Sequence, residues 1–151
     1  MIAAGIAVLV LGSGGLGWLA ATGSGPFAPG GPVTPRFVEE TASAGIATTY
    51  DGPFAYFTGG GLAVLDCDDD GRPDIYVAGG TNPAGLYRNE SARGGPLRFS
   101  PIGSDVTDLT DVTGAYPLDL DGDGITDLAV LRIGGNLLLR GTGNCGFEPA
   151  N

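Results

Sequence analysis

The sequence predicts an all-β fold in which one unit of short strands occurs twice. An acidic loop of the pattern D-x-D-x-D-G-x-x-D occupies residues 66–74 and occurs again, 53 positions later, at residues 119–127. Each loop lies between apolar runs of four residues, a length and composition that favour buried strands over helices. Each copy continues with an arginine-containing segment, a glycine-rich turn and an aromatic residue. The whole stretch is therefore a repeat, of which the loop is one part.

The predicted strands follow the same order in both copies. Apolar runs at residues 62–65 and 75–78 flank the first loop, and runs at 115–118 and 128–131 flank the second. The other expected strands are the arginine-containing segments 86–89 and 138–141 and the aromatic segments 36–39, 98–100 and 146–148. We expect an aromatic strand to open each unit, which gives about four strands in roughly 50 residues. That is the size and content of a β-propeller blade.

Two units are fewer than a propeller contains, since known propellers have about four to eight blades. Residues 147–151 read as the aromatic strand that opens a third unit. We therefore interpret the chain as an incomplete propeller, or as one that pairs with copies of itself, with a compact two-blade β-domain as the alternative. Pro117 lies in a predicted strand and cannot donate a ladder hydrogen bond, so that strand should be irregular or lie at a sheet edge.

The two acidic loops are predicted to bind calcium. Closely spaced carboxylates repel one another, and Ca²⁺ takes six to eight oxygen ligands in a flexible shell. Mg²⁺ demands a stricter octahedron, and Zn²⁺ is disfavoured because the chain has no His and only two Cys. The predicted ligands are the side chains of Asp66, Asp68, Asp70 and Asp74 with the carbonyl of Arg72, and the side chains of Asp119, Asp121, Asp123 and Asp127 with the carbonyl of Ile125. A solvated acidic turn is the alternative for each loop.

An EF-hand is excluded, because its loop needs a Glu at position twelve and this chain has Val77 and Val130 there. The loop between apolar strands, followed by L-Y-R-N at residues 86–89 and a turn to Phe99, instead resembles the FG-GAP/VCBS repeat. Residues 37–46, F-V-E-E-T-A-S-A-G-I, resemble the branch that includes ASPIC/UnbV and cartilage acidic protein. Together these similarities extend over about residues 36–151.

The resemblance implies a fold and a function. FG-GAP/VCBS repeats build the seven-bladed propellers of integrin alpha subunits and of many secreted bacterial proteins. Their loops bind calcium that acts structurally, and their blades present surfaces to protein or glycan partners. Cys67 departs from the family pattern, which usually has an aromatic or aliphatic residue at that position.

The amino terminus is expected to direct the chain out of the cytoplasm. Residues 2–21 contain no charge and are predicted to form a hydrophobic helix, so residues 1–21 are a signal peptide or a membrane anchor, with a buried helix as the alternative. Residues 22–35 are a Gly/Pro-rich linker, and the calcium-binding repeats occupy residues 36–151. An extracellular, cell-surface or periplasmic location follows, with membrane contact through the amino-terminal segment.

Charge and composition narrow the function further. Seventeen acidic and seven basic residues give a net charge of −10, which two bound Ca²⁺ ions would bring to −6. Such a chain repels nucleic acid. Without His there is no Ser-His-Asp or Cys-His arrangement, so we expect no enzymatic activity.

The expected function is adhesion, or interaction with a protein or glycan at the cell surface. A non-catalytic scaffold part of a larger secreted enzyme and a self-assembling surface protein are the alternatives. Cys67 and Cys145 form a disulfide or remain two separate thiols. Arg88 and Arg140 recur at one repeat position, and each is expected to pair with a nearby loop Asp.

Overall fold

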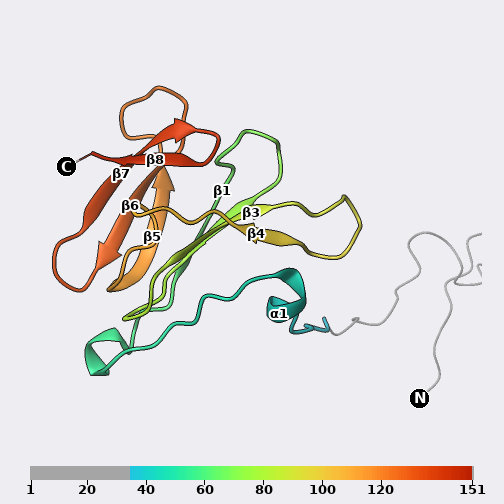
Figure 1. The fold of residues 1–151 in the computed structure, drawn as a ribbon, viewed down its shortest axis with the longest axis horizontal. Coiled ribbons are helices and arrows are strands. Elements are labelled where there is room, and N and C mark those ends of the chain that lie inside the picture. The colour runs from blue at the N-terminus through green and yellow to red at the C-terminus, as the bar shows by residue number, and fades with distance from the viewer. Residues whose placement is uncertain (1–34, 151) are drawn as a thin grey trace, which may run out of the picture. The chain divides into compact units, whose positions relative to one another are not determined.

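Two four-stranded antiparallel sheets follow one another along the chain (Figure 1). They are seen in a computed structural model in which residues 35–150 are described. Sheet 1 contains β1 (Leu62–Leu65), β2 (Asp74–Val77), β3 (Gly85–Asn89) and β4 (Phe99–Pro101). Sheet 2 contains β5 (Val112–Leu118), β6 (Asp127–Arg132), β7 (Leu137–Gly143) and β8 (Gly146–Pro149). The α-helix α1 (Thr41–Ala44) and the 3₁₀ helix η1 (Phe54–Tyr56) precede them.

The spatial order of the strands equals their order in the sequence, in both sheets. This topology follows from connections that are short enough to join antiparallel neighbours. The predicted all-β fold with two strand repeats is confirmed, and the two sheets are blade-like in size and connectivity.

The predicted position of the aromatic strand within the unit is wrong. Phe99 lies in β4, which pairs with β3 and closes sheet 1, and Phe147 lies in β8, which pairs with β7 and closes sheet 2. Residues 147–151 therefore do not open a third unit, and residues 36–39 form no strand. In a cyclic pattern the sequence does not show where a unit begins. The hairpin connection between β3 and β4 decides it, because it places the aromatic strand beside the arginine-containing strand that precedes it.

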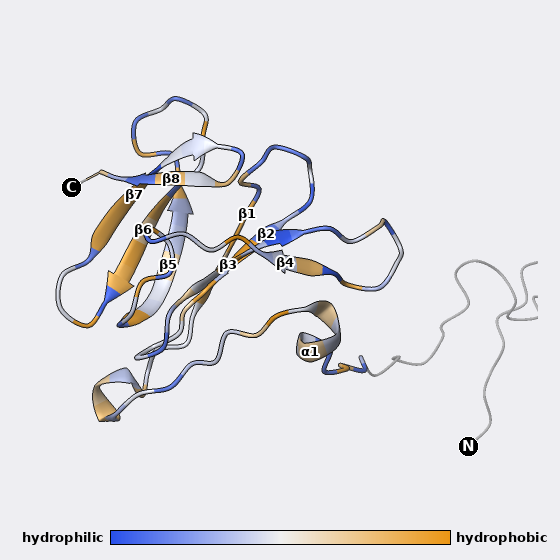
Figure 2. Ribbon diagram, viewed as in Figure 1, coloured by the Kyte–Doolittle hydropathy of each residue, from blue (hydrophilic) through white to orange (hydrophobic). Residues whose placement is uncertain are grey.

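A shared hydrophobic core joins the two sheets. Alternate residues of β1, β2 and β3 contribute one row across sheet 1, in which Ala63 is opposite Tyr76 and Tyr76 is opposite Leu86. Leu128 and Leu139 contribute a corresponding row from sheet 2, and all five side chains are buried in one cluster. Figure 2 shows hydrophobic residues along β6 and β7 and mostly hydrophilic residues in the connection between β1 and β2.

The first strands of the two sheets lie side by side, with equivalent glycines at the contact. A Cβ atom on Gly61 would lie 3.3 Å from the Cα of Gly114, a tight contact that the absence of a side chain at Gly61 avoids. The Gly61 N–H also donates a hydrogen bond of 3.1 Å to the carbonyl of Thr113. Pro117 lies in β5, which pairs only with β6, so the predicted edge position is confirmed.

The predicted hydrophobic helix, with its alternatives of signal peptide or membrane anchor, lies at residues 1–21 and outside the described residues. The same holds for residues 22–34 of the predicted linker. Within residues 35–150 no helix has the length and apolar character needed to span a membrane.

Candidate metal sites in two acidic loops

The two acidic loops occupy equivalent places in the two sheets. The first connects β1 to β2, the second connects β5 to β6, and both project toward the same side of the view in Figure 1. Both connections are therefore hairpin loops that join the first strand of a sheet to the second.

Aspartate side chains fold each loop around its own backbone N–H groups. At loop position one, Asp66 accepts hydrogen bonds from the N–H groups of Asp70 (3.1 Å) and Gly71 (2.9 Å). The equivalent Asp119 accepts from Gly122 (2.7 Å) and Gly124 (3.1 Å). These contacts bring the start of each loop against its sixth residue.

The glycine at loop position six has a left-handed backbone in both copies. Gly71 has φ 76° and Gly124 has φ 83°, values that favour glycine over residues with a side chain. No heavy atom lies within 4 Å of a Cβ built at either position, so the requirement is conformational and not steric. The motif glycine therefore permits the same sharp turn in both loops.

The aspartate at loop position nine is buried and ties the loop to the third strand. Asp74 accepts hydrogen bonds from the N–H groups of Cys67 (3.0 Å) and Asn89 (2.8 Å). Asp127 accepts from the N–H of Leu120 (2.7 Å) and from the N–H of Gly141 in β7 (2.8 Å). Gly141 is the repeat equivalent of Asn89. Burial raises the pKa of Asp74, and the nearby carboxylates of Asp68 and Asp70 add to this, while the two N–H donors lower it.

Three carboxylates gather in each loop, and the two groups differ in membership. In the first loop Asp66, Asp68 and Asp70 each offer an oxygen, and these atoms lie within 4.8 Å of one another. In the second loop the corresponding group is Asp119, Asp121 and Asp127. Of the predicted ligands, Asp74 and Asp123 lie outside these groups. Asp74 accepts from two backbone N–H groups, and Asp123 accepts from the Ile125 N–H at 2.8 Å. The carbonyl ligands predicted at Arg72 and Ile125 stay predictions.

One oxygen in the first loop is buried without a hydrogen-bond donor. Asp68 Oδ1 has no hydrogen-bond partner among the described residues, although its neighbour Oδ2 pairs with Arg88 at 2.9 Å. A buried acceptor without a donor is costly. A cation bound by Asp66, Asp68 and Asp70 would satisfy this oxygen, so the residues present fit a metal ion.

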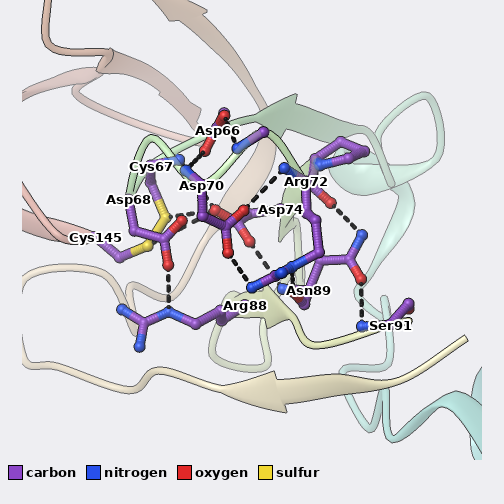
Figure 3. Close-up of polar contacts among 12 residues, drawn as sticks. Asp66, Cys67, Asp68, Asp70, Arg72, Asp74, Arg88, Asn89, Ser91 and Cys145 are labelled. Carbon is purple, nitrogen blue, oxygen red and sulfur yellow. Dashed lines mark hydrogen bonds and ion pairs between the residues drawn. A yellow bond between two sulfur atoms is a disulfide. The ribbon is translucent and has the colours of Figure 1, made fainter. Parts of the chain in front are cut away.

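Arginines neutralise part of each loop, as the sequence predicted. Besides the Arg88 pair, Arg140 Nε lies 3.5 Å from Asp121, at the equivalent loop position. The first loop has a further cation, because Arg72 forms an ion pair with Asp70 and donates from Nε to the carbonyl of Asn89 at 2.9 Å. Figure 3 shows both arginines of the first loop directed toward its carboxylates.

A disulfide connects the first loop to sheet 2. Cys67 and Cys145 are bridged, with their Cα atoms 4.5 Å apart, and the Cys145 N–H donates to the Cys67 carbonyl at 2.8 Å (Figure 3). The alternative of two separate thiols is therefore wrong. Cys67 Sγ also lies 3.0 Å from Asp74 Oδ2, but a bridged sulfur carries no proton and cannot donate. Because both sulfurs are bonded, Cys67, Asp74 and Cys145 do not form a metal site.

Sequence reasoning gave Asn89 no role in the loop, yet this residue holds the loop in place. Its side-chain amide donates to the carbonyl of Pro73 at 2.9 Å, and its N–H donates to Asp74. The feature that could have indicated this role is the position of Asn89 directly after Arg88, in the segment that pairs with β2.

Blade-like sheets with an acidic hairpin loop at the same step define a β-propeller-like repeat protein. Residues 66–130, from the first loop to β6, match the family described as FG-GAP-like repeat. This match covers less than half of the chain and supports the assignment of the segment as an FG-GAP-like repeat, as the resemblance predicted. No curated protein matches the chain.

Proposed function

We propose that the chain is an exported calcium-binding segment of a β-propeller, in which each acidic loop holds one structural Ca²⁺. The observation that carries this proposal is the orphaned Asp68 Oδ1 beside Asp66 and Asp70, repeated in outline by Asp119, Asp121 and Asp127. Without a cation, carboxylate oxygens within 4.8 Å of one another repel.

The donor set favours calcium. The side-chain groups gathered in the loops are carboxylates, and the cysteine that could offer sulfur is bridged. Hard oxygen donors without imidazole or thiolate suit Ca²⁺ better than Zn²⁺. The ion would supply charge neutralisation and would hold the hairpin loop in one conformation.

The expected stabilisation is modest. Extracellular calcium modules have dissociation constants of about 10⁻⁴ to 10⁻³ M. For a site of about 0.1 mM in about 2 mM calcium, linkage gives roughly 1.8 kcal/mol for each loop.

Export is supported by two features. A disulfide persists in oxidising compartments outside the cytoplasm, and residues 2–21 are uncharged. We propose a non-catalytic role at the cell surface, in which the blades present a surface to a protein or glycan partner.

Calorimetric titration of the full chain with calcium tests the metal sites. We expect two sites in the wild type, and a site weakened about tenfold in Asp70→Asn and, separately, in Asp121→Asn. Asp69→Asn is the matched control, because it removes the same charge from the first loop at a position that is not a predicted ligand. An absence of binding, or equal weakening in Asp69→Asn and Asp70→Asn, would falsify the ligand assignment.

A further inference from the structure

The two sheets use opposite faces to form their shared core. We define face A by the residues that β1, β2 and β3 and the first loop contribute to the core from sheet 1. They are Ala63, Leu65, Cys67, Tyr76, Ala78 and Leu86, and all six are buried. Face B is the other side of each sheet, and sheet 2 contributes face B to the core through residues that include Leu128, Val130 and Leu139.

Face A of sheet 2 is apolar but open. Each of the six face-A residues of sheet 1 has an equivalent at the same repeat position in sheet 2. These equivalents are Tyr116, Leu118, Leu120, Ala129, Leu131 and Leu138. Strand pairing supports this equivalence, because Tyr116 is opposite Ala129 and Ala129 is opposite Leu138. All six side chains are exposed or half-buried, and Tyr116 is 63% exposed. A surface that is core in one copy of the repeat is thus presented to solvent in the other.

Face B of sheet 1 is the complementary open surface. Its residues Leu62 and Val64 are exposed, whereas Ala115, the equivalent of Leu62 in sheet 2, is buried in the core. The N–H groups of Ala47 and Thr48 donate to the Tyr87 hydroxyl at 3.0 and 2.9 Å, so these residues cover the β3 side of this face. The β1–β2 side remains accessible.

We propose that face A of sheet 2 docks on face B of sheet 1 of a second copy of this chain. The contact repeats, between chains, the face A to face B packing that already joins the two sheets within one chain. Because the two surfaces differ, the interface is heterologous and generates a closed ring or an open row of copies. This inference does not depend on calcium.

The test is sedimentation of the full chain over a range of concentrations, compared among charged variants. Tyr116→Glu places a charge on face A and Val64→Glu places one on face B, where the native side chain is 53% exposed. Leu97→Glu is the matched control, because Leu97 is 48% exposed in the connection between β3 and β4. All variants retain residues 1–34, so that segment affects them equally. Far-UV circular dichroism verifies that each variant is folded.

We expect the wild type and Leu97→Glu to reach at least twice the mass of one chain, and both face variants to remain monomeric. A mixture of Tyr116→Glu and Val64→Glu should form a pair that grows no further, because each variant retains the surface that the other lacks. Leu120→Lys and Leu62→Lys should reproduce the result with the opposite charge. A monomeric wild type, unchanged association of either face variant, or a mixture that forms no pair would overturn the proposal.

Discussion

The two acidic loops have the same backbone arrangement in different surroundings. Both close through the aspartate at position one and are tied to the third strand by the aspartate at position nine. They differ at position three, where the Asp68 side chain is 12% exposed and the Asp121 side chain is 41% exposed. They differ also at position two, where Cys67 is bridged and the equivalent Leu120 is exposed.

This difference separates what the motif specifies from what its neighbours add. The shared hydrogen bonds come from Asp and Gly residues that belong to the motif itself. The neutralising charges come from outside that shared pattern, because Arg72 and Arg88 serve the first loop while the second has Ile125 and the half-exposed Arg140. Each loop has four predicted ligand carboxylates, which two arginines face in the first loop and one in the second. These ligands are therefore the better neutralised without an ion in the first loop.

The largest expected effect is the loss of stability when the first loop loses its disulfide, compared with a substitution at the same position of the unbridged loop. Replacing both cysteines, as Cys67→Ala with Cys145→Ala, should lower the free energy of unfolding by about 4 kcal/mol, since the bridge closes a long loop in the unfolded chain. Leu120→Ala, at the equivalent exposed position of the second loop, should change it by about 0.5 kcal/mol or less. Urea unfolding measures both. A loss of about 1 kcal/mol or less in the cysteine variant would contradict the prediction.

The next effect tests whether the loops are equivalent in their shared part. Asp74→Ala and Asp127→Ala each leave two backbone N–H groups without an acceptor, which should cost about 2–4 kcal/mol in either loop. Unfolding should be measured with excess chelator, so that loss of a bound ion does not contribute. Asn at either position retains one acceptor oxygen and should cost about half as much. Clearly unequal losses of unfolding free energy in the two loops would show that equivalent hydrogen bonds contribute unequally to stability.

The smallest effect concerns calcium affinity and rests on the proposed function. A unit charge about 6 Å from a divalent ion in a water-like dielectric costs about 1 kcal/mol. Arg72→Ile should therefore strengthen calcium binding at the first loop about fivefold, and Ile125→Arg should weaken the second by a similar factor. Arg93→Ile, which removes an exposed arginine outside the loops, is the control. If calorimetric titration gives the same calcium affinities for all three variants, the arginine at loop position seven does not determine the affinity.

Most of the strand pattern could be predicted from the sequence. Each strand beside an acidic loop is visible as a short apolar run, and each acidic loop marks the two strands that flank it. The predicted run 62–65 coincides with β1, and the pairing of Arg88 and Arg140 with loop aspartates is confirmed. These features depend on residues close in sequence or related by the repeat. The placement of the aromatic strand could not be predicted, because a cyclic repeat has no marked beginning.

The candidate site was predictable in part. The motif located the carboxylates of both loops, but it did not show that Asp74 lies outside the first group whereas its equivalent Asp127 lies in the second. The partner of Cys67 was also left open, because a bridge to Cys145 depends on how the two sheets pack. Long-range geometry of this kind is absent from a local pattern.

The bridge between Cys67 and Cys145 closes the intervening chain, a separation of 78 residues, into a covalent ring. The ring contains β2 to β7, whereas β1 and β8 extend from it as tails. A protease that cuts once within the ring, for example in the exposed connection at residues 92–97, opens it without releasing a fragment. The nicked molecule would migrate as one species without reductant and as two with it, so the bridge holds the two parts of a cut chain together.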